Sequence, residues 1–374
     1  ATAGTAANYQ FACSCWDNDG NVYVAEVNTA TGAVNLWKVT KAGVVDWSFD
    51  AEFLVAAGSL RNLAGMAVVG DYLYVACTLV AGVTSYVHRI KTSDHSVQHN
   101  WLSASTSVAQ PWLHTFFSSA SHNCLAGCGT SLLGVECFGI SVENSHGLRI
   151  YDATTSTPNA NPLKILYWNS TAGGGGTAQN NQTKLVSDNI GYFYAIASVN
   201  TEIIRKVGIG GQLEWKSSAG GTPTGLAYDR YGDGTTPMLV STTTSTPAVR
   251  SLSLTAGAQI DSADPGSITS WNEIDSDDTG SFVIWRNIAA VNTDVVVVSN
   301  TLDVTVGPVT LSNETHSGAS VNKGDVAISP PTAASRQIRA LLVSGGECFR
   351  FDGDGTVEIA NDNDTMAFGG GTFN

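Results

Sequence analysis

A unit of two short β-rich runs recurs seven times along the chain, and this repetition restricts the possible folds more than any other feature. Each copy has an apolar run, a polar turn rich in Gly, Asn, Asp or Thr, and a second apolar run. The first copy is NVYVAEV at residues 21–27 with VNLWKV at 34–39, and the fourth is GYFYAIAS at 191–198 with EIIRKV at 202–207. A further short apolar run precedes each hairpin and another follows in most copies. Each unit therefore predicts four short strands.

No long segment has the 3.6-residue periodicity of an amphipathic helix, so the pattern predicts an all-β chain. Four-stranded sheets that repeat radially form a β-propeller, in which neighbouring sheets cover each other's faces. We expect a single β-propeller domain over residues 1–374 with about seven four-stranded blades. Residues 1–16, through the run Tyr9–Trp16, are expected to add a strand to the last blade and close the ring. The predicted blades lie near residues 17–53, 62–105, 125–171, 182–220, 223–275, 282–315 and 324–368.

Two residue types mark the repeat. A basic residue recurs in the second run of six copies, and we expect it on the polar face of a strand opposite an acid. These residues are Lys38, Arg89, Arg149, Arg205, Arg250 and Arg350. A Trp recurs in the run that follows, where blade-to-blade packing is the expected role of a large indole. These residues are Trp47, Trp101, Trp168, Trp215 and Trp271.

The segments WKVTKAGVVDWSF at 37–49 and RKVGIGGQLEWKSS at 205–218 resemble the PQQ-like propeller repeat, which also occurs in outer-membrane assembly propellers of the BamB type. The resemblance implies that one strand ends in a Gly-containing turn and that the Trp of the next strand docks between blades. The quinone-dependent dehydrogenases of that family use two directly adjacent cysteines beside the cofactor. No two of the seven cysteines here are adjacent, so the resemblance implies the scaffold without that cofactor.

The composition excludes two classes of function. With 18 basic and 32 acidic residues the formal net charge is −14, and no basic cluster offers a surface for a phosphate backbone, so we expect no nucleic-acid partner. No apolar stretch approaches the roughly 18 residues of a membrane-spanning helix, so the chain is not expected to span a membrane.

The cysteines leave three alternatives open. Cys124 and Cys128 are the nearest candidates for a local disulfide, and Cys137 and His122 lie close enough in sequence for a metal site. The spacing of these residues matches no strong zinc pattern. Ordinary buried thiols are the third alternative.

Two sets of residues are candidates for a binding site. Trp16, Trp112 and Trp285 fall outside the repeated Trp position and are candidates for stacking on a ligand such as a sugar. Asp17, Asp19 and Asn21 have the one-three-five spacing that begins a calcium loop, but position 28 is Asn instead of the bidentate Glu that completes such a loop. A Gly after an Asp is also the signal of a tight turn. Calcium is the one cofactor considered for this segment.

No catalytic motif was found, since the chain has neither a nucleophile elbow nor an H-E-x-x-H sequence. We therefore expect a non-enzymatic propeller that serves as a structural or protein-interaction module, on an extracellular, cell or virion surface. A carbohydrate-binding propeller is one alternative. A metal-dependent hydrolase or lactonase with its site at the central channel is the other, because propeller scaffolds carry all three roles.

Overall fold

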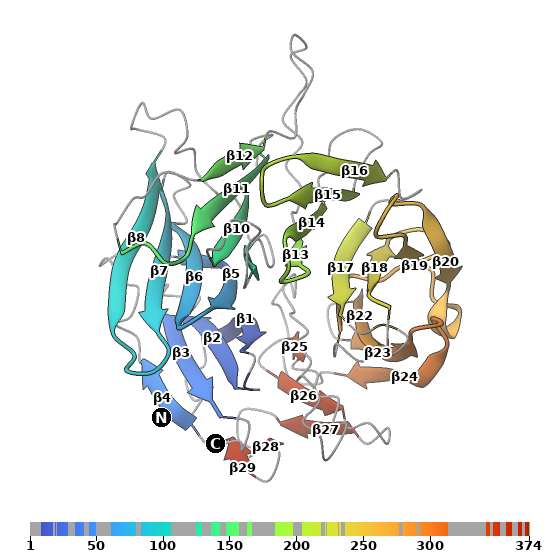
Figure 1. The fold of residues 1–374 in the computed structure, drawn as a ribbon. Helices are drawn as coiled ribbons and strands as arrows, with labels where there is room; N and C mark the ends of the chain where they lie inside the picture. The colour runs from blue at the N-terminus through green and yellow to red at the C-terminus, as the bar shows by residue number, and fades with distance from the viewer. Residues whose placement is uncertain are drawn as a thin grey trace. The chain divides into compact units, whose positions relative to one another are not determined.

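The computed structural model describes residues 9–17, 19, 21–28, 34–40, 45–49, 61–79, 84–105, 125–128, 136–142, 147–156, 163–166, 184–196, 204–217, 221, 223–230, 232, 236–276, 280–289, 292–312, 342–344, 347–351, 357–360, 366–368 and 371–373 (Figure 1). Apart from one 3-10 turn, η1 (Pro265–Ser267), every regular element in these ranges is a β-strand. No helix in the described ranges has the length and hydropathy needed to cross a membrane. The prediction of an all-β chain is confirmed.

The chain divides into two compact units. The unit of residues 56–220 and 255–257 contains three four-stranded sheets. Their strands are β5 (Arg61–Val69), β6 (Tyr72–Leu79), β7 (Thr84–Lys91) and β8 (Val97–Ser105); β9 (Leu125–Cys128), β10 (Cys137–Val142), β11 (Gly147–Asp152) and β12 (Lys164–Leu166); and β13 (Leu185–Ser187), β14 (Tyr192–Ile196), β15 (Ile204–Gly208) and β16 (Leu213–Ser217).

The unit of residues 1–55, 221–254 and 258–374 contains three more four-stranded sheets, a three-stranded sheet and a two-stranded sheet among its described residues. The four-stranded sheets are β1 (Tyr9–Trp16), β2 (Val22–Asn28), β3 (Val34–Val39) and β4 (Val45–Phe49); β17 (Pro223–Asp229), β18 (Met238–Thr243), β19 (Val249–Leu252) and β20 (Gln259–Ala263); and β21 (Glu273–Ser276), β22 (Ser281–Ala289), β23 (Asn292–Ser299) and β24 (Val304–Ser312). The smaller sheets are β25 (Leu342–Ser344), β26 (Glu347–Phe351) and β27 (Val357–Ala360), and β28 (Met366–Phe368) and β29 (Gly371–Phe373).

The sheets β5–β8, β9–β12 and β13–β16 of one unit stack face to face in chain order, and so do the sheets β17–β20 and β21–β24 of the other. Each four-stranded sheet is an antiparallel meander. The first strands of neighbouring sheets touch, β5 with β9 and β9 with β13 in one unit and β17 with β21 in the other. Buried clusters fill the space between sheets; one joins Tyr74 and Trp101 to Phe138, and another joins Val240 to Phe282. This stacking is how a thin sheet removes both faces from water, and it is the arrangement of propeller blades.

The N-terminal run corrects one expectation. Tyr9–Trp16 forms β1 and pairs antiparallel with β2, from Tyr9 opposite Asn28 to Trp16 opposite Val22. The run is therefore the first strand of the first sheet, and the prediction that it adds a strand to the last blade was wrong. Residue 17, expected to begin the first blade, lies in the turn after that strand.

A bulge recurs in the outermost strand of four sheets and shows the repeat at the level of the backbone. In each sheet one residue of the outermost strand is left without a register partner, while the residues on either side of it pair with consecutive residues of the preceding strand. The inserted residues are Asp46, Glu214, Ile260 and Thr305, and all four are exposed.

The repeated basic residues occupy two positions instead of one. Lys38 and Arg89 lie opposite Tyr23 and Tyr74, and the residue opposite the matching Tyr194 is Lys206. Arg205 is one residue away, and a shift of one residue turns a side chain to the other face of a sheet.

Burial also corrects the expected role of these residues. Lys38 forms the expected ion pair across strands, with 2.8 Å between its Nζ and an Oδ2 of Asp46. Four of the repeated arginines are buried instead of lying on a polar face: Arg89, Arg149, Arg205 and Arg250.

Three of the repeated tryptophans are buried, and Trp101 shows the predicted packing between sheets, with its ring centroid 5.6 Å from that of Phe138 in the next sheet. Trp47, Trp101 and Trp215 are buried in outermost strands, each against a tyrosine of its own sheet, with ring centroids 5.9, 5.5 and 6.1 Å apart. Trp271 is buried too, but it lies after η1 and before β21, outside the outermost strand β20. Trp168 lies outside the described residues.

Candidate functional site

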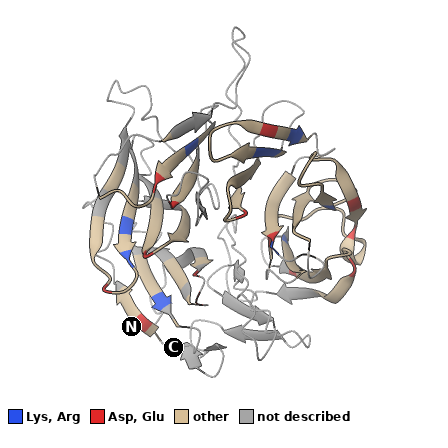
Figure 2. Cartoon of the chain, viewed as in Figure 1, with Lys and Arg blue, Asp and Glu red and all other residues tan. Residues whose placement is uncertain are grey.

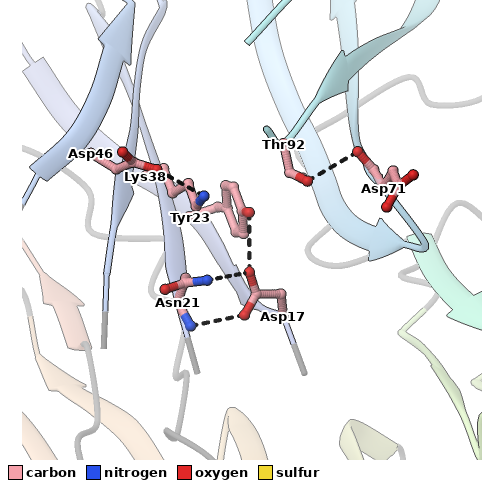
Figure 3. Close-up of polar contacts among 7 residues, drawn as sticks. All are labelled: Asp17, Asn21, Tyr23, Lys38, Asp46, Asp71 and Thr92. Atoms are coloured by element: carbon pink, nitrogen blue, oxygen red, sulfur yellow. Dashed lines mark hydrogen bonds and ion pairs between the residues drawn. The ribbon is translucent and has the colours of Figure 1, made fainter. Parts of the chain in front are cut away.

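The acidic turn at Asp17 joins β1 to β2 and is held by its own carboxylate (Figure 3). Oδ1 of Asp17 accepts hydrogen bonds from the backbone N–H of Asp19 and of Asn21, at 3.0 and 2.9 Å. Oδ2 accepts from the Asn21 side-chain amide at 2.8 Å and from the Tyr23 hydroxyl at 3.1 Å. Both carboxylate oxygens are thus engaged by the turn itself, which is the role of Asp at the first position of such turns.

The same arrangement recurs where other first strands end. Asp188 follows β13, and its Oδ1 accepts from three successive backbone N–H groups, those of Ile190, Gly191 and Tyr192, each at 2.9 Å. Asp229 ends β17 and accepts from the N–H of Gly232. Because the carboxylate turn belongs to the repeat, its presence at Asp17 is explained by the fold without any bound ion.

The calcium hypothesis for Asp17, Asp19 and Asn21 stays a prediction. Asp17 and Asn21 are brought together by the turn, and Asp19 is exposed beside them. Among the residues that the structure describes, no group of three or more His, Cys, Asp or Glu side chains is arranged to hold a metal ion. A cation would have to compete with the hydrogen bonds that Asp17 already accepts.

Each of the other two contacts in Figure 3 joins elements of a single sheet. The ion pair of Lys38 and Asp46 links β3 to β4. The Thr92 hydroxyl donates to the backbone carbonyl of Asp71 at 3.0 Å, and the Thr92 N–H donates to the same oxygen at 2.8 Å. These contacts connect the turn between β5 and β6 to the end of β7.

The three candidate tryptophans are not brought together into one site by the described structure. Trp285 lies in β22 and is only 3% exposed, so its indole is part of the packed interior and is not the surface stacking platform that the sequence suggested. Trp16 lies in β1, opposite Val22. Trp112 lies outside the described residues.

The most unusual polar group in the unit of residues 56–220 is Arg89, which the sequence placed on a polar face. It is 2% exposed, and its guanidinium lies 4.2 Å from the ring centroid of Tyr72 and 5.2 Å from that of Trp101. Nη1 donates to the carbonyls of Ala153 and Thr155, at 3.3 and 2.5 Å. Nε donates to Oε1 of Gln98 at 2.8 Å. Arg89 therefore ties the sheet β5–β8 to the sheet β9–β12.

Asp229 has the corresponding role in the other unit. It is fully buried, and its Oδ2 accepts from the Ser276 hydroxyl at 2.6 Å and from the Gly280 N–H at 2.8 Å. Ser276 ends β21 and Gly280 precedes β22, so the carboxylate joins two sheets.

Burial shifts the ionisation of groups around these contacts. It raises the pKa of the Tyr151 hydroxyl to about 12 and raises the pKa of Tyr74 further, although Arg89 opposes the shift of Tyr74. The Tyr74 hydroxyl donates to the carbonyl of Ala153 at 2.7 Å. Burial lowers the pKa of Lys206, whose Nζ lies 3.8 Å from the ring centroid of Tyr192, while Asp188 and Glu214 oppose that shift. These groups stabilise the packing between strands and sheets.

The exposed surface shows a different pattern. Figure 2 shows that most of the described ribbon carries neither acidic nor basic residues. A large apolar side chain is exposed on each of four outermost strands. In three of these strands it belongs to the first residue of the strand, directly before the bulge residue. These three are Val45, Leu213 and Val304, with 42%, 42% and 40% exposed; the fourth is Ile260 with 72% exposed. We call these four residues the outer-strand apolar set.

The comparisons with known proteins show the fold. No family model matches the chain, and no curated protein matches it. Several solved propellers resemble it over most of its length. The fold is a β-propeller. Hsv2 of Kluyveromyces lactis matches with a TM-score of 0.52 at 8% identity, covering 96% of this chain and 99% of that one.

Two further structures agree with this assignment. A quinonprotein alcohol dehydrogenase-like protein from Bacteroides thetaiotaomicron matches with a TM-score of 0.52 at 14% identity. The match covers 83% of this chain and 67% of that protein's chain. BBS1N in complex with ARL6DN has a TM-score of 0.50 at 12% identity and covers 98% and 96%. At these identities the likeness concerns the arrangement of the backbone alone, because one propeller scaffold carries unrelated activities.

Proposed function

We propose that this propeller is a non-enzymatic module that binds other proteins through its outermost strands. The observation that carries the proposal is the outer-strand apolar set, because the same register position exposes a large aliphatic side chain in three sheets. Fully burying an exposed Val, Leu or Ile side chain contributes about 1.5–3 kcal/mol, so a partner that covers any one of these partly exposed residues gains part of that free energy.

The structural neighbours are compatible with this role and also with others. BBS1N was solved as a complex with another protein, ARL6DN. The Bacteroides neighbour is described as alcohol dehydrogenase-like. The scaffold is therefore compatible with protein binding and also with enzymatic activity. Our preference for protein binding rests on the exposed aliphatic residues of this chain.

The test is a selection of binding peptides from a displayed random library, with the immobilised full chain as the bait. We expect the selected peptides to lose about tenfold or more in affinity for a variant with Val45→Thr, Leu213→Thr, Ile260→Thr and Val304→Thr. A matched control replaces exposed polar residues of the same strands, Ser48→Ala, Glu214→Ala, Gln259→Ala and Thr305→Ala, and should bind as the unchanged chain does.

Equal binding to both variants would overturn the proposal. A glycan array and a metal analysis of the purified chain examine the two alternative functions directly. A glycan that binds regardless of the outer-strand apolar set would favour carbohydrate recognition. A stoichiometric metal ion with hydrolytic activity would favour an enzyme.

We further propose that the chain forms one domain of seven blades with the PQQ-like scaffold. The support is the sevenfold repeat of the sequence, the six four-stranded sheets, and the sheet β25–β27, which lies where the seventh repeat was predicted. An experimental structure with six or eight blades would contradict this count. Calorimetric unfolding in two separate transitions would contradict a single domain.

An extracellular, cell-surface or virion-surface location is also proposed, on composition alone: a net charge of −14 and abundant Gly, Ala, Ser and Thr. Protease treatment of intact cells and of purified particles from the source tests this location. Digestion of the chain without lysis supports it, and full protection in both preparations contradicts it.

A further inference from the structure

Two of the cysteines lie opposite each other in the sheet β9–β12. Cys128 is the last residue of β9 and Cys137 is the first residue of β10, and the two are register partners in the antiparallel ladder. Of the six cysteines in described strands, these two are the only ones paired in register with each other; the register partners of the other four are not cysteines.

The spacing of such a pair suits a disulfide. Directly opposite residues in an antiparallel ladder have Cα atoms about 4.5–5.5 Å apart. A disulfide requires a Cα separation of about 4.4–6.8 Å, so the backbone needs no rearrangement to accommodate the bond.

The sequence had suggested Cys124 as the partner of Cys128, and the strand geometry argues against that choice. β9 is extended from Leu125 to Cys128, which separates those two Cα atoms by about 10 Å. Cys124 itself lies outside the described residues, and its Cα is fixed at about 3.8 Å from that of Leu125, the residue of β9 farthest from Cys128. Cys137 is held opposite Cys128 by the ladder itself.

We propose that Cys128 and Cys137 are a modification site, a thiol pair that oxidises to a disulfide across the first two strands of this sheet. The bond would join the two strands at the end of the ladder where the chain passes from β9 to β10, opposite to the end at Leu125 and Ile140. The proposal is independent of the outer-strand apolar set and of protein binding.

The chemistry requires an oxidant, for which we name glutathione disulfide. One cysteine thiolate attacks the glutathione disulfide, forming a mixed disulfide and releasing one glutathione thiol. The second cysteine then attacks the mixed disulfide, the protein disulfide forms, and a second glutathione thiol leaves. Two electrons and two protons pass from the two cysteines to the two glutathione molecules.

Burial sets the conditions of the reaction. Cys137 is fully buried in a cluster with Leu148, Ile150, Leu185 and Phe193. Reactivity of a thiol follows its thiolate fraction and its access to solvent, both of which burial reduces. The disulfide therefore forms during folding, or slowly from the folded state, and once formed it is shielded from soluble reductants.

The experiment uses the full chain, refolded in a buffer of oxidised and reduced glutathione. The reaction is stopped with acid, the chain is unfolded, remaining thiols are alkylated, and the protein is digested without reduction for mass spectrometry. We expect a cross-linked peptide pair that contains Cys128 and Cys137, both of them protected from alkylation. The cross-link should persist in Cys124→Ser and disappear in Cys137→Ser.

The cross-link measured in the chain without substitutions tests the proposal even if the Cys137→Ser variant does not fold. Alkylation of both Cys128 and Cys137 after refolding in oxidising buffer would overturn the proposal. A cross-link between Cys124 and Cys128 would overturn it equally, and would restore the pairing suggested by the sequence.

Discussion

Two contacts between neighbouring sheets, which we call joints, are each built around one buried charged side chain, and the two charges have opposite signs. Between the sheets β5–β8 and β9–β12, the cation of Arg89 donates to two backbone carbonyls and lies against the rings of Tyr72 and Trp101. Between the sheets β17–β20 and β21–β24, the anion of Asp229 accepts from a hydroxyl and from a backbone N–H. Each joint contains a buried charge whose hydrogen bonds are made to the next sheet.

The cores around the two charges differ as well. The first joint stacks aromatic rings, with centroids 4.5 Å apart for Tyr74 and Phe138 and 5.4 Å apart for Phe138 and Tyr151. The second is mainly aliphatic, with Val240, Ile274 and other branched residues around Trp271. The fold thus requires a filled space and satisfied polar groups between blades, and many residue combinations meet that requirement. This freedom explains how propellers at 8–14% identity share one backbone arrangement.

The largest effect is expected from breaking the cationic joint with Arg89→Ala. The change removes the donors to Ala153 and Thr155 and the packing on two rings, so the free energy of unfolding should fall by about 3–5 kcal/mol. Urea unfolding followed by Trp fluorescence measures it. Lys91→Ala, which removes an exposed ion pair with Asp94, serves as the control and should change stability by less than about 0.5 kcal/mol. Equal effects of the two substitutions would show that no such joint exists.

A smaller loss is expected from Asp229→Asn in the anionic joint. The amide keeps the shape of the side chain but replaces one acceptor oxygen by a donor, which then opposes the Ser276 hydroxyl or a backbone N–H. We expect a destabilisation of about 1–3 kcal/mol in the same assay. The exposed Asp303→Asn is the matched control. A neutral result for Asp229→Asn would mean that the carboxylate contributes nothing to sheet packing.

The aromatic joint should also make stability depend on alkaline pH. The pKa of Tyr151 is raised from 10 to about 12 because the folded state buries its hydroxyl. The unfolded chain loses that proton at lower pH than the folded chain, so the contribution is complete below pH 10 and is lost as the pH rises from 10 to 12. Thermal melts across that range should fall less steeply for Tyr151→Phe. Parallel curves for the two proteins would exclude this contribution.

The smallest effect is expected outside the joints, at Ile260. This residue occupies the bulge position where the equivalent residues of other sheets are polar, and it is 72% exposed. Ile260→Thr should leave stability within about 0.5 kcal/mol. Ile274→Thr, which places a hydroxyl in the buried cluster of the second joint, should lower it by about 2 kcal/mol or more in the same melts. Comparable losses would mean that Ile260 has a structural role.

The sequence predicted what depends on local pattern. The hairpins, the repeat and the burial of Trp47, Trp101 and Trp215 follow from alternation and from the size of the side chains. The N-terminal strand was misassigned because a β-rich run does not reveal its pairing partner. The basic position was misread because Arg205 and Lys206 are adjacent, and only the register shows which one matches Lys38.

The joints could not be predicted because their contacts are distant in sequence. Asp229 bonds to a residue 51 positions away, and Arg89 bonds to residues 64 and 66 positions away. Arginine side chains are usually exposed, so the residue type alone gives no reason to expect that Arg89 is buried. The exposure of the outer-strand apolar set could not be predicted either, because an aliphatic residue in a β-rich run is expected to face a core.

Hydrogen exchange measured by mass spectrometry on the Arg89→Ala variant tests the central claim, that buried polar joints hold adjacent sheets face to face. We expect faster exchange both in β7 and in residues 153–155, which follow β11 of the neighbouring sheet, with exchange in β18 and β23 unchanged. Faster exchange confined to β7, with residues 153–155 as protected as in the unchanged chain, would contradict it.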